Sequence, residues 1–173
     1  AKFEDQLLSV IPANTLLLVD RGFYHFQFFA DLIAQGSHLI TRLKAKAHFD
    51  IEQSLSQSQS HRDQVILLGV KRKNAPQVRL RLIQMRCGKT WYSYLTSVLD
   101  PQVLPPFVVA DLYRRRWRIE EAFHTVKRLL NLSYLWTGSL NGIQLQIWAT
   151  WLFYAILVDL GDAVADAARV PAD

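Results

Sequence analysis

The sequence has almost no cysteine, and this scarcity excludes two classes of site. Cys87 is the single cysteine among 173 residues, so an internal disulfide is impossible. No group of cysteine and histidine residues has the spacing of a structural zinc site. The composition therefore fits a reducing compartment such as the cytosol.

Long apolar runs are also missing. The longest, residues 147–158, falls well short of the ~20 residues that a membrane span needs, so we expect a core helix there and no membrane partner. No signal peptide opens the chain. The chain starts with Ala1 inside helix-like sequence, so we expect the N-terminus to be a cut edge of a longer protein.

Acidic residues are outnumbered by basic ones. Lys and Arg number 20 against 15 Asp and Glu, for a formal net charge of +5. An excess of this size favours a phosphate-bearing partner only weakly, because many ordinary proteins share it. Half of the residues are apolar, which is enough for one domain with a substantial core.

The first third of the chain predicts an α/β fold. Residues 15–19 form an apolar run closed by Asp20, residues 23–35 carry apolar side chains at helical spacing, and residues 38–43 predict a second strand. A strand, helix and strand in succession favour parallel pairing of the two strands.

Residues 44–99 have a different character and predict a β-rich segment. We expect a Gln/Ser-rich loop at 53–60 and strands near 65–70, 78–85 and 90–99. Arg79 and Arg81 alternate with leucines, which indicates one face that is either solvated or in contact with phosphate, and the solvated interpretation is favoured. Two long helices, 105–132 and 140–160, are predicted to end the chain.

A helical wheel divides the first long helix into two faces. The predicted core face comprises Val108, Leu112, Ile119, Ala122, Phe123, Val126 and Leu130. The opposite stripe comprises Tyr113, Arg116, Trp117, Glu120, His124 and Lys127. The stripe therefore presents one carboxylate among cations and aromatic rings.

Two interpretations of this stripe compete. Glu120 could pair with Arg116 in an ordinary salt-bridged surface, and spacing alone favours that. Alternatively, Glu120 holds a divalent cation while the cations and rings grip DNA, with Tyr113 and Trp117 packing on sugars or bases. Without the neighbouring cations, phosphate would be repelled.

Asp20 is the second candidate carboxylate. It ends the apolar run at 16–19, where ligands of open α/β sheets collect, and Gly22 permits a tight turn behind it. The competing interpretation, slightly favoured on this evidence alone, is an N-cap for the helix that begins near Phe23. One or two carboxylates with water and phosphate oxygens suffice for Mg²⁺.

These residues resemble the catalytic domain of insertion-sequence transposases of the IS-four group. That group has a signature of Tyr, two residues, Arg, three residues, Glu, six residues and Lys, which Tyr113, Arg116, Glu120 and Lys127 match at every spacing. The stretches WYSYLTS at 91–97 and DLYRRRW at 111–117 are also similar, and LLLVDRGF at 16–23 resembles the segment of the family's second catalytic Asp.

The resemblance implies a DDE transposase with a truncated RNase H-like fold, in which 44–99 is a β-rich insertion between the second Asp and the Glu. It implies that Asp20 and Glu120 are catalytic ligands of Mg²⁺, or of Mn²⁺. Tyr113, Arg116 and Lys127 would then contact transposon-end DNA, and the wheel adds Trp117 and His124. Expected partners are transposon-end DNA, target DNA and a second copy in a synaptic complex, in the bacterial cytoplasm near the nucleoid.

One member of the family's three-carboxylate site has no counterpart here. The family's first catalytic Asp lies several strands before the second, and the upstream acids, Glu4 and Asp5, lie in a helix-like stretch that does not fit it. We therefore expect this chain to be inactive alone. The alternative function is a non-catalytic, DNA-binding remnant of a decayed transposase.

Overall fold

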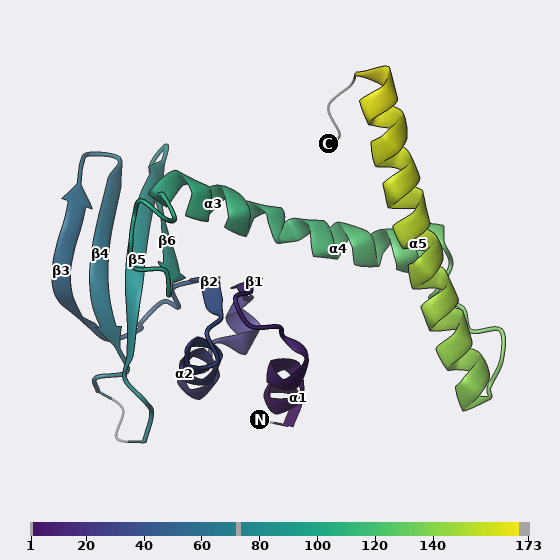
Figure 1. Cartoon of the computed structure of the whole chain (residues 1–173), viewed down its shortest axis with the longest axis horizontal. Coiled ribbons are helices and arrows are strands. Elements are labelled where there is room, and N and C mark those ends of the chain that lie inside the picture. The colour runs from purple at the N-terminus through teal and green to yellow at the C-terminus, as the bar shows by residue number, and fades with distance from the viewer. Residues whose placement is uncertain (1, 72–73, 170–173) are drawn as a thin grey trace. The chain divides into compact units, whose positions relative to one another are not determined.

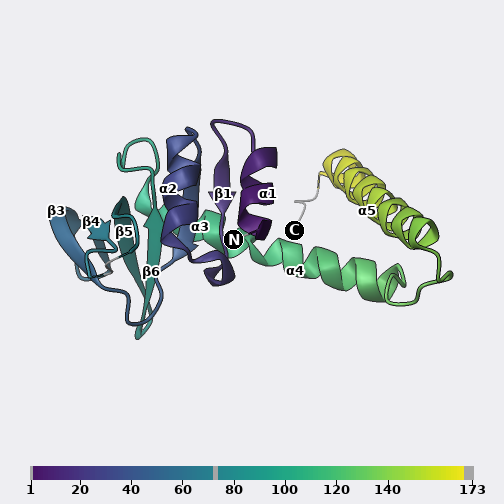
Figure 2. The same cartoon turned by 90° about the horizontal axis from the view of Figure 1, so that it is seen from below.

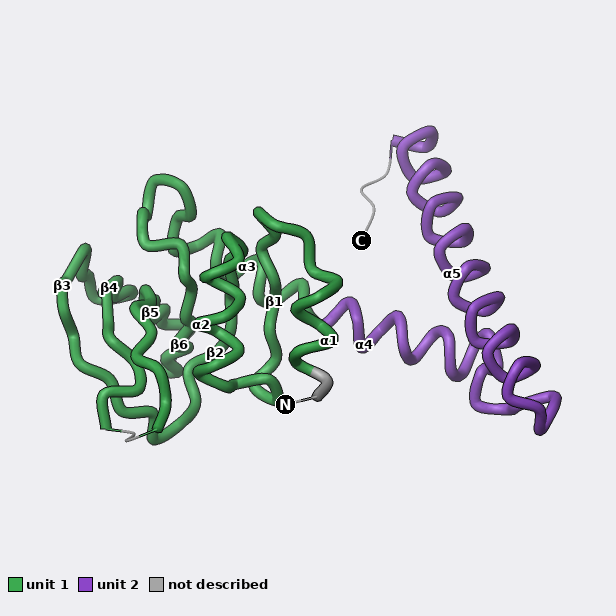
Figure 3. The backbone as a smooth tube through the Cα atoms, turned by 60° about the horizontal axis from the view of Figure 1, so that its bottom comes forward, with its two compact units in different colours: residues 1–116 green, residues 117–173 purple. Residues whose placement is uncertain are grey.

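A computed structural model describes residues 2–71 and 74–169. The chain divides into two compact units, residues 1–116 and 117–173, which are drawn in different colours in Figure 3. Each unit is described separately below.

The first unit contains three α-helices, a short 3₁₀ turn and six strands among its described residues. In chain order these are α1 (Lys2–Val10), β1 (Leu16–Leu18), η1 (Arg21–Phe23), α2 (Phe26–Ala34), β2 (His38–Arg42), β3 (Phe49–Gln57), β4 (His61–Leu68), β5 (Val78–Cys87), β6 (Thr90–Thr96) and α3 (Pro106–Arg115), labelled where room allows in Figure 1.

The six strands form one mixed sheet with the order β1-β2-β6-β5-β4-β3. β1 and β2 pair in parallel, which confirms the predicted strand, helix and parallel strand. The remaining neighbours are antiparallel. The strands of the β-rich segment 44–99 therefore extend the same sheet, because β6 lies directly beside β2.

The Gln/Ser-rich stretch was predicted to be a loop, and this prediction is wrong for most of it. Residues 53–57 lie in β3, which pairs with β4 at the edge of the sheet. Both faces of β3 are largely exposed, so its side chains lack the apolar alternation that identifies a strand. Backbone pairing with β4, and not side-chain pattern, keeps this stretch extended.

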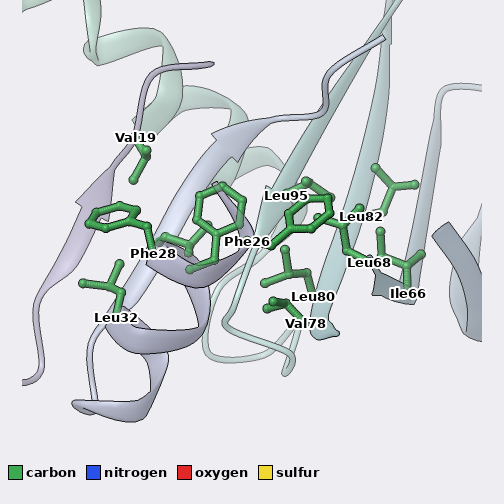
Figure 4. Close-up of a cluster of buried hydrophobic side chains, with 12 residues drawn as sticks. Val19, Phe26, Phe28, Leu32, Ile66, Leu68, Val78, Leu80, Leu82 and Leu95 are labelled. Carbon is green, nitrogen blue, oxygen red and sulfur yellow. The ribbon is translucent and has the colours of Figure 1, made fainter. Parts of the chain in front are cut away.

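The sheet is covered on both faces. On one face, α2 packs against strand residues to form a cluster that includes Phe28, Phe29 and Leu32 (Figure 4). On the other face, α3 packs Val109 and Tyr113 against Ile40 and Ile83. Figure 2 shows α2 and α3 on either side of the strands. At the ~25 cal/mol per Å² typical of buried apolar surface, these clusters supply the main stabilisation of the unit.

Arg81 corrects the expectation of a solvated arginine face on β5. Its side chain is fully buried because the α3 side of the sheet is covered. The guanidinium donates to both carboxylate oxygens of Asp63, at 2.7 and 2.6 Å, and to the carbonyl oxygen of Leu104 at 2.7 Å. Arg79, two residues earlier, is exposed and pairs with Glu52, as the solvated interpretation predicts. Arg81 thus ties β4 and β5 to the loop that leads into α3.

The second unit is helical throughout its regular structure. It contains α4 (Trp117–His124), the π-helical turn η2 (Thr125–Leu129) and α5 (Leu140–Ala168). The single helix predicted for 105–132 is therefore interrupted at Arg116 and changes hydrogen-bonding pattern at Thr125. The second predicted helix is confirmed and is longer than expected.

A short loop is fixed to the start of α5 by side-chain amide contacts. Gln146 accepts from the Trp136 backbone N–H at 3.1 Å and donates to the Tyr134 carbonyl oxygen at 2.7 Å. Ser139 caps the helix by accepting from the Gly142 N–H. The Ser139 bond satisfies a backbone N–H of the first turn of α5, and the two Gln146 bonds satisfy backbone groups of the preceding loop.

The apolar side chains of α5 are mostly exposed, contrary to the expected core position of 147–158. Among the described residues of α5 only Gln146 is buried. Within the described part of the second unit, α5 has α4, η2 and the loop at Tyr134 and Trp136 beside it, which is too little surface to cover a helix of 29 residues. By length and composition, α5 is also the one described helix that could cross a bilayer.

Candidate functional site

Asp20 lies where the sequence places it, directly after β1. Its side chain accepts a hydrogen bond from the Arg21 backbone N–H at 2.7 Å and caps η1. Asp20 therefore caps this 3₁₀ turn, and the predicted N-cap for a helix beginning near Phe23 is wrong, because α2 begins at Phe26 and its N-cap is His25. The side chain remains 53 % exposed, so capping leaves carboxylate surface available to a ligand.

The end of α3 brings two signature residues to Asp20. Arg116 follows the helix, and its Nε lies 4.0 Å from Oδ1 of Asp20. The Arg116 guanidinium also lies over the Tyr113 ring, 5.8 Å from its centroid. We call Asp20, Tyr113 and Arg116 the β1-edge cluster. A carboxylate beside a guanidinium can bind a cation and a phosphate side by side.

Tyr113 departs from the predicted exposed stripe. It is 7 % exposed and packs in the α3 core cluster, with its ring 5.6 Å from that of Tyr94. The predicted wheel is wrong here because α3 buries Val109 and Tyr113, while Val108 and Leu112 are only partly buried. The Tyr113 ring is therefore largely inaccessible to a sugar or base, and it lies against the Arg116 guanidinium.

The electrostatics of the cluster centre on Tyr113. Burial raises the pKa of its hydroxyl above the usual 10.0, the Arg116 guanidinium opposes this rise, and the Asp20 carboxylate adds to it. Burial also raises the pKa of Tyr94, and Arg42 acts in the opposite direction. Both phenols are therefore neutral at physiological pH and can donate hydrogen bonds.

Arg42 and Tyr94 adjoin this cluster and were missed from the sequence. Arg42 ends β2, the strand parallel to β1, and is paired in register with Tyr94 of β6. The reasoning that selected Asp20 at the end of β1 could also have selected Arg42, since parallel strands end at one edge. Tyr94 carried no such signal, because its contact with Tyr113 depends on the packing of α3.

In the second unit, α4 exposes the predicted polar residues Trp117, Glu120 and His124. The predicted core positions Ala122 and Val126 are buried. Ile119 and Phe123 were also predicted to be core and are exposed. A single short helix thus presents both a polar and an apolar surface.

Lys127 lies in the π-helical turn η2. The Leu130 N–H donates to the Thr125 carbonyl oxygen at 3.0 Å, an i to i+5 bond that widens the turn. The hydrogen-bonding pattern changes at Thr125, so a wheel at 100° per residue no longer describes the position of Lys127, which is exposed. Its ammonium instead lies 5.6 Å from the Phe123 ring centroid. Single π turns occur frequently at functional sites.

Comparison with known protein families identifies the family of this chain. Residues 1–156 match the model of the transposase DDE domain. The chain belongs to the transposase DDE domain family. The match extends into α5 and ends at residue 156, just past the midpoint of that helix, so more than half of the exposed apolar helix belongs to the family domain.

Three relatives of this DDE domain are transposases by name. It is 26 % identical to the transposase InsG for insertion sequence element IS4 of Escherichia coli (strain K12), over 88 % of this chain and 36 % of the relative. It is 22 % identical to a probable transposase for insertion sequence element IS5377 of Geobacillus stearothermophilus, over 84 % of this chain and 39 % of the relative. A putative transposase, y4zB, of Sinorhizobium fredii is 19 % identical over 85 % of this chain and 43 % of the relative.

These shares show that the DDE domain chain spans well under half the length of the relatives it matches. The DDE domain match and the similarity to the transposase of IS4 support the predicted IS-four-type membership. Within residues 2–71 and 74–169, no group of three or more Asp, Glu, His or Cys side chains gathers as a metal site. Asp20 and Glu120 belong to different units of the domain, and their separation stays a prediction.

Proposed function

We propose that this chain is the part of an insertion-sequence transposase that carries two of its three catalytic carboxylates, Asp20 and Glu120, on an RNase H-like fold. The observation that carries the proposal is the β1-edge cluster. Two segments of the family signature, the Asp that follows β1 and the Tyr and Arg that end α3, meet at one edge of the sheet. Family membership supplies the reaction class.

The donor chemistry at Asp20 fits a hard divalent cation. Carboxylate oxygens are preferred ligands of Mg²⁺, and Mn²⁺ accepts the same donors. Asp20 and Glu120 would hold the ion, which when bound would activate the attacking oxygen and stabilise the leaving oxygen of a phosphodiester. Arg116, 4.0 Å from Asp20, would neutralise the incoming phosphate that the carboxylates alone would repel.

The remaining signature residues, Tyr113 and Lys127, position DNA together with Trp117 and His124. Tyr113 is buried beneath Arg116 and orients the guanidinium through ring contact. Trp117 and His124 expose an aromatic and an imidazole ring on α4, and Lys127 adds a cation on η2. Such groups bind phosphates, sugars and unstacked bases of DNA.

The proposed substrates are transposon-end DNA and target DNA, cleaved and joined at one site by a transposase that acts as a homodimer in a synaptic complex. The proposed compartment is the bacterial cytoplasm, near the nucleoid. No membrane partner is proposed for α5, because the DDE domain match continues into that helix as far as residue 156.

A nicking assay tests the catalytic assignment. The complete transposase that contains this chain, and with it the third carboxylate, is incubated with Mg²⁺ and a duplex carrying the end of its own insertion sequence. We expect Glu120→Gln and Asp20→Asn to abolish nicking and to leave DNA binding intact. Glu121→Gln, which removes the neighbouring exposed charge of α4, is the matched control and should nick at the normal rate. Nicking that survives in the Glu120→Gln variant would overturn the assignment.

A second candidate function is DNA binding without catalysis. The lack of a three-membered acid, histidine or cysteine group among the described residues favours it. In that case the unaltered complete protein binds the duplex but produces no nick at any Mg²⁺ or Mn²⁺ concentration. Nicking by the unaltered complete protein would exclude this candidate.

A further inference from the structure

The first unit contains a pocket with a volume of about 340 Å³ that the proposed catalytic function does not use. It is lined by Tyr24, Phe26, Lys44, Ala45, Lys46, Ala47, His48, Gly69 and Lys71. Three of these residues are lysines, one is histidine, and none of the described lining residues is acidic. We call this the lysine pocket. The positive charge of these lining residues favours the binding of an anion.

The pocket is assembled from three separate chain segments. The start of α2 supplies Tyr24 and Phe26, the connection from β2 to β3 supplies Lys44 and Lys46, and the turn after β4 supplies Lys71. Phe26 is 8 % exposed and belongs to the α2 core cluster, so the floor of the pocket is fixed by the fold. The cations are thus held over a rigid apolar base.

Two details show that the cations are constrained at this place. The Lys44 ammonium lies 5.1 Å from the Tyr24 ring centroid, an attraction that orients it. Lys46 has a φ of 67°, the left-handed conformation that a residue with a Cβ adopts at a cost of about 1 kcal/mol. Glycine would adopt that backbone conformation at lower cost, and Lys46 instead places an ammonium-bearing side chain at the pocket.

Gly69 lines another side of the lysine pocket, where the turn after β4 packs closely against its neighbours. Its φ is 93°, and a Cβ at this position would lie 2.7 Å from the Pro76 carbonyl oxygen and 3.4 Å from Phe26. Only glycine lets the turn after β4 approach the Pro76 backbone this closely. The same approach brings Lys71 to the pocket rim.

We infer that the lysine pocket binds phosphodiester groups of the DNA on which the transposase acts, as a second, sequence-independent contact separate from the β1-edge cluster. This inference rests on the proposed function for the identity of the polyanion. Asp20 and Tyr24 flank η1 on either side, so DNA contacts at both places would clamp the backbone around the end of β1. Lysines contribute point charges that recognise phosphate without reading bases.

The test is the salt dependence of binding to a random-sequence 20-bp duplex, without divalent metal, by fluorescence anisotropy. Each phosphate contact contributes about 0.9 to the slope of log K against log salt. We expect Lys44→Gln/Lys71→Gln to lower the slope by about 1 to 2. Lys89→Gln, an exposed lysine in the turn between β5 and β6, removes one charge elsewhere and should leave the slope unchanged.

Lys46→Gly separates binding from folding. Removing the left-handed lysine should leave the melting temperature equal or higher, while affinity for the duplex falls two- to tenfold. An unchanged affinity in Lys46→Gly, or an equal slope change in Lys89→Gln and the double variant, overturns the inference.

The result is independent of catalysis. If nicking fails but the slope changes as expected, the proposed reaction is wrong and the lysine pocket stands. If nicking succeeds and the slope is unaltered in the pocket variants, the reverse holds. NMR offers an independent way to locate the DNA contact. The amide signals of Ala45 and Ala47 should shift when the duplex is added, and shifts confined to other segments would contradict DNA binding at the lysine pocket.

Discussion

The two units of this chain differ in how they use their apolar residues. The first unit buries them on both faces of a six-stranded sheet, in clusters around Phe29 and Val109. The second unit leaves most of them exposed along α5, where Trp148, Leu152 and Phe153 have little to pack against. A sheet with helices on two faces encloses a core, whereas a short helix and one long helix do not.

This difference affects the candidate site, because its residues are divided between the two units. Asp20, Tyr113 and Arg116 are held by the core of the first unit, while Glu120 and Lys127 stand on the helices of the second. The first group is positioned by burial and ion pairing. The second lies on α4 and η2, beside ring contacts such as that between Phe123 and Trp151 at 5.1 Å.

The largest effect should come from a matched pair of phenylalanine truncations. Phe29→Ala, at a fully buried site of α2, should destabilise the first unit by about 4 kcal/mol through lost burial and a cavity. Phe153→Ala, at a site 52 % exposed on α5, should change stability by less than about 1 kcal/mol.

Hydrogen exchange read by mass spectrometry gives the opening free energy of each unit separately. Equal losses in both variants would show that α5 is packed as tightly as α2, and the contrast between the units would then fail.

The next effect concerns the buried ion pair of the first unit. Arg81→Met leaves the Asp63 carboxylate buried without its partner, and should cost about 3 kcal/mol in urea unfolding. Arg79→Met, which breaks the exposed pair with Glu52, should cost less than about 1 kcal/mol.

A double variant sharpens the test of the ion pair. Arg81→Met with Asp63→Leu should recover much of the lost stability, because neither charge then remains buried. If the double variant is as unstable as Arg81→Met, the loss arises from packing and not from the unpaired carboxylate.

The smallest effect is the alkaline pH dependence of the β1-edge cluster. The pKa of Tyr113 is raised in the folded chain, so the unfolded chain loses that proton first as pH rises past about 10. The stabilisation is complete below pH 10 and is lost as pH rises through the higher folded pKa. Between pH 9 and 11, the melting temperature of Tyr113→Phe should fall less steeply than that of the unaltered chain. A titration followed by absorbance at 295 nm should show one fewer tyrosine that ionises late. An unchanged pH slope in that variant would place Tyr113 in ordinary surroundings.

Much of the candidate site follows from sequence because its markers are local. The apolar run before Asp20 predicts a strand end, and the spacing of Arg116, Glu120 and Lys127 is that of one helical region. Arg42 and the lysine pocket did not follow, since their neighbours come from distant segments that only the fold brings together. The β3 edge strand was missed because its pairing with β4 is a backbone interaction with no side-chain period.

By itself, the sequence determined the α/β class, the parallel pairing of β1 and β2, and the family to which the signature belongs, because periodicity and spacing are properties of neighbouring residues. Only tertiary structure decided that Tyr113 is buried and that Arg81 is an internal ion-pair partner. Tyrosine and arginine carry both apolar and polar groups, so either side of an element can accept them. The packing of α3 against the sheet made that choice.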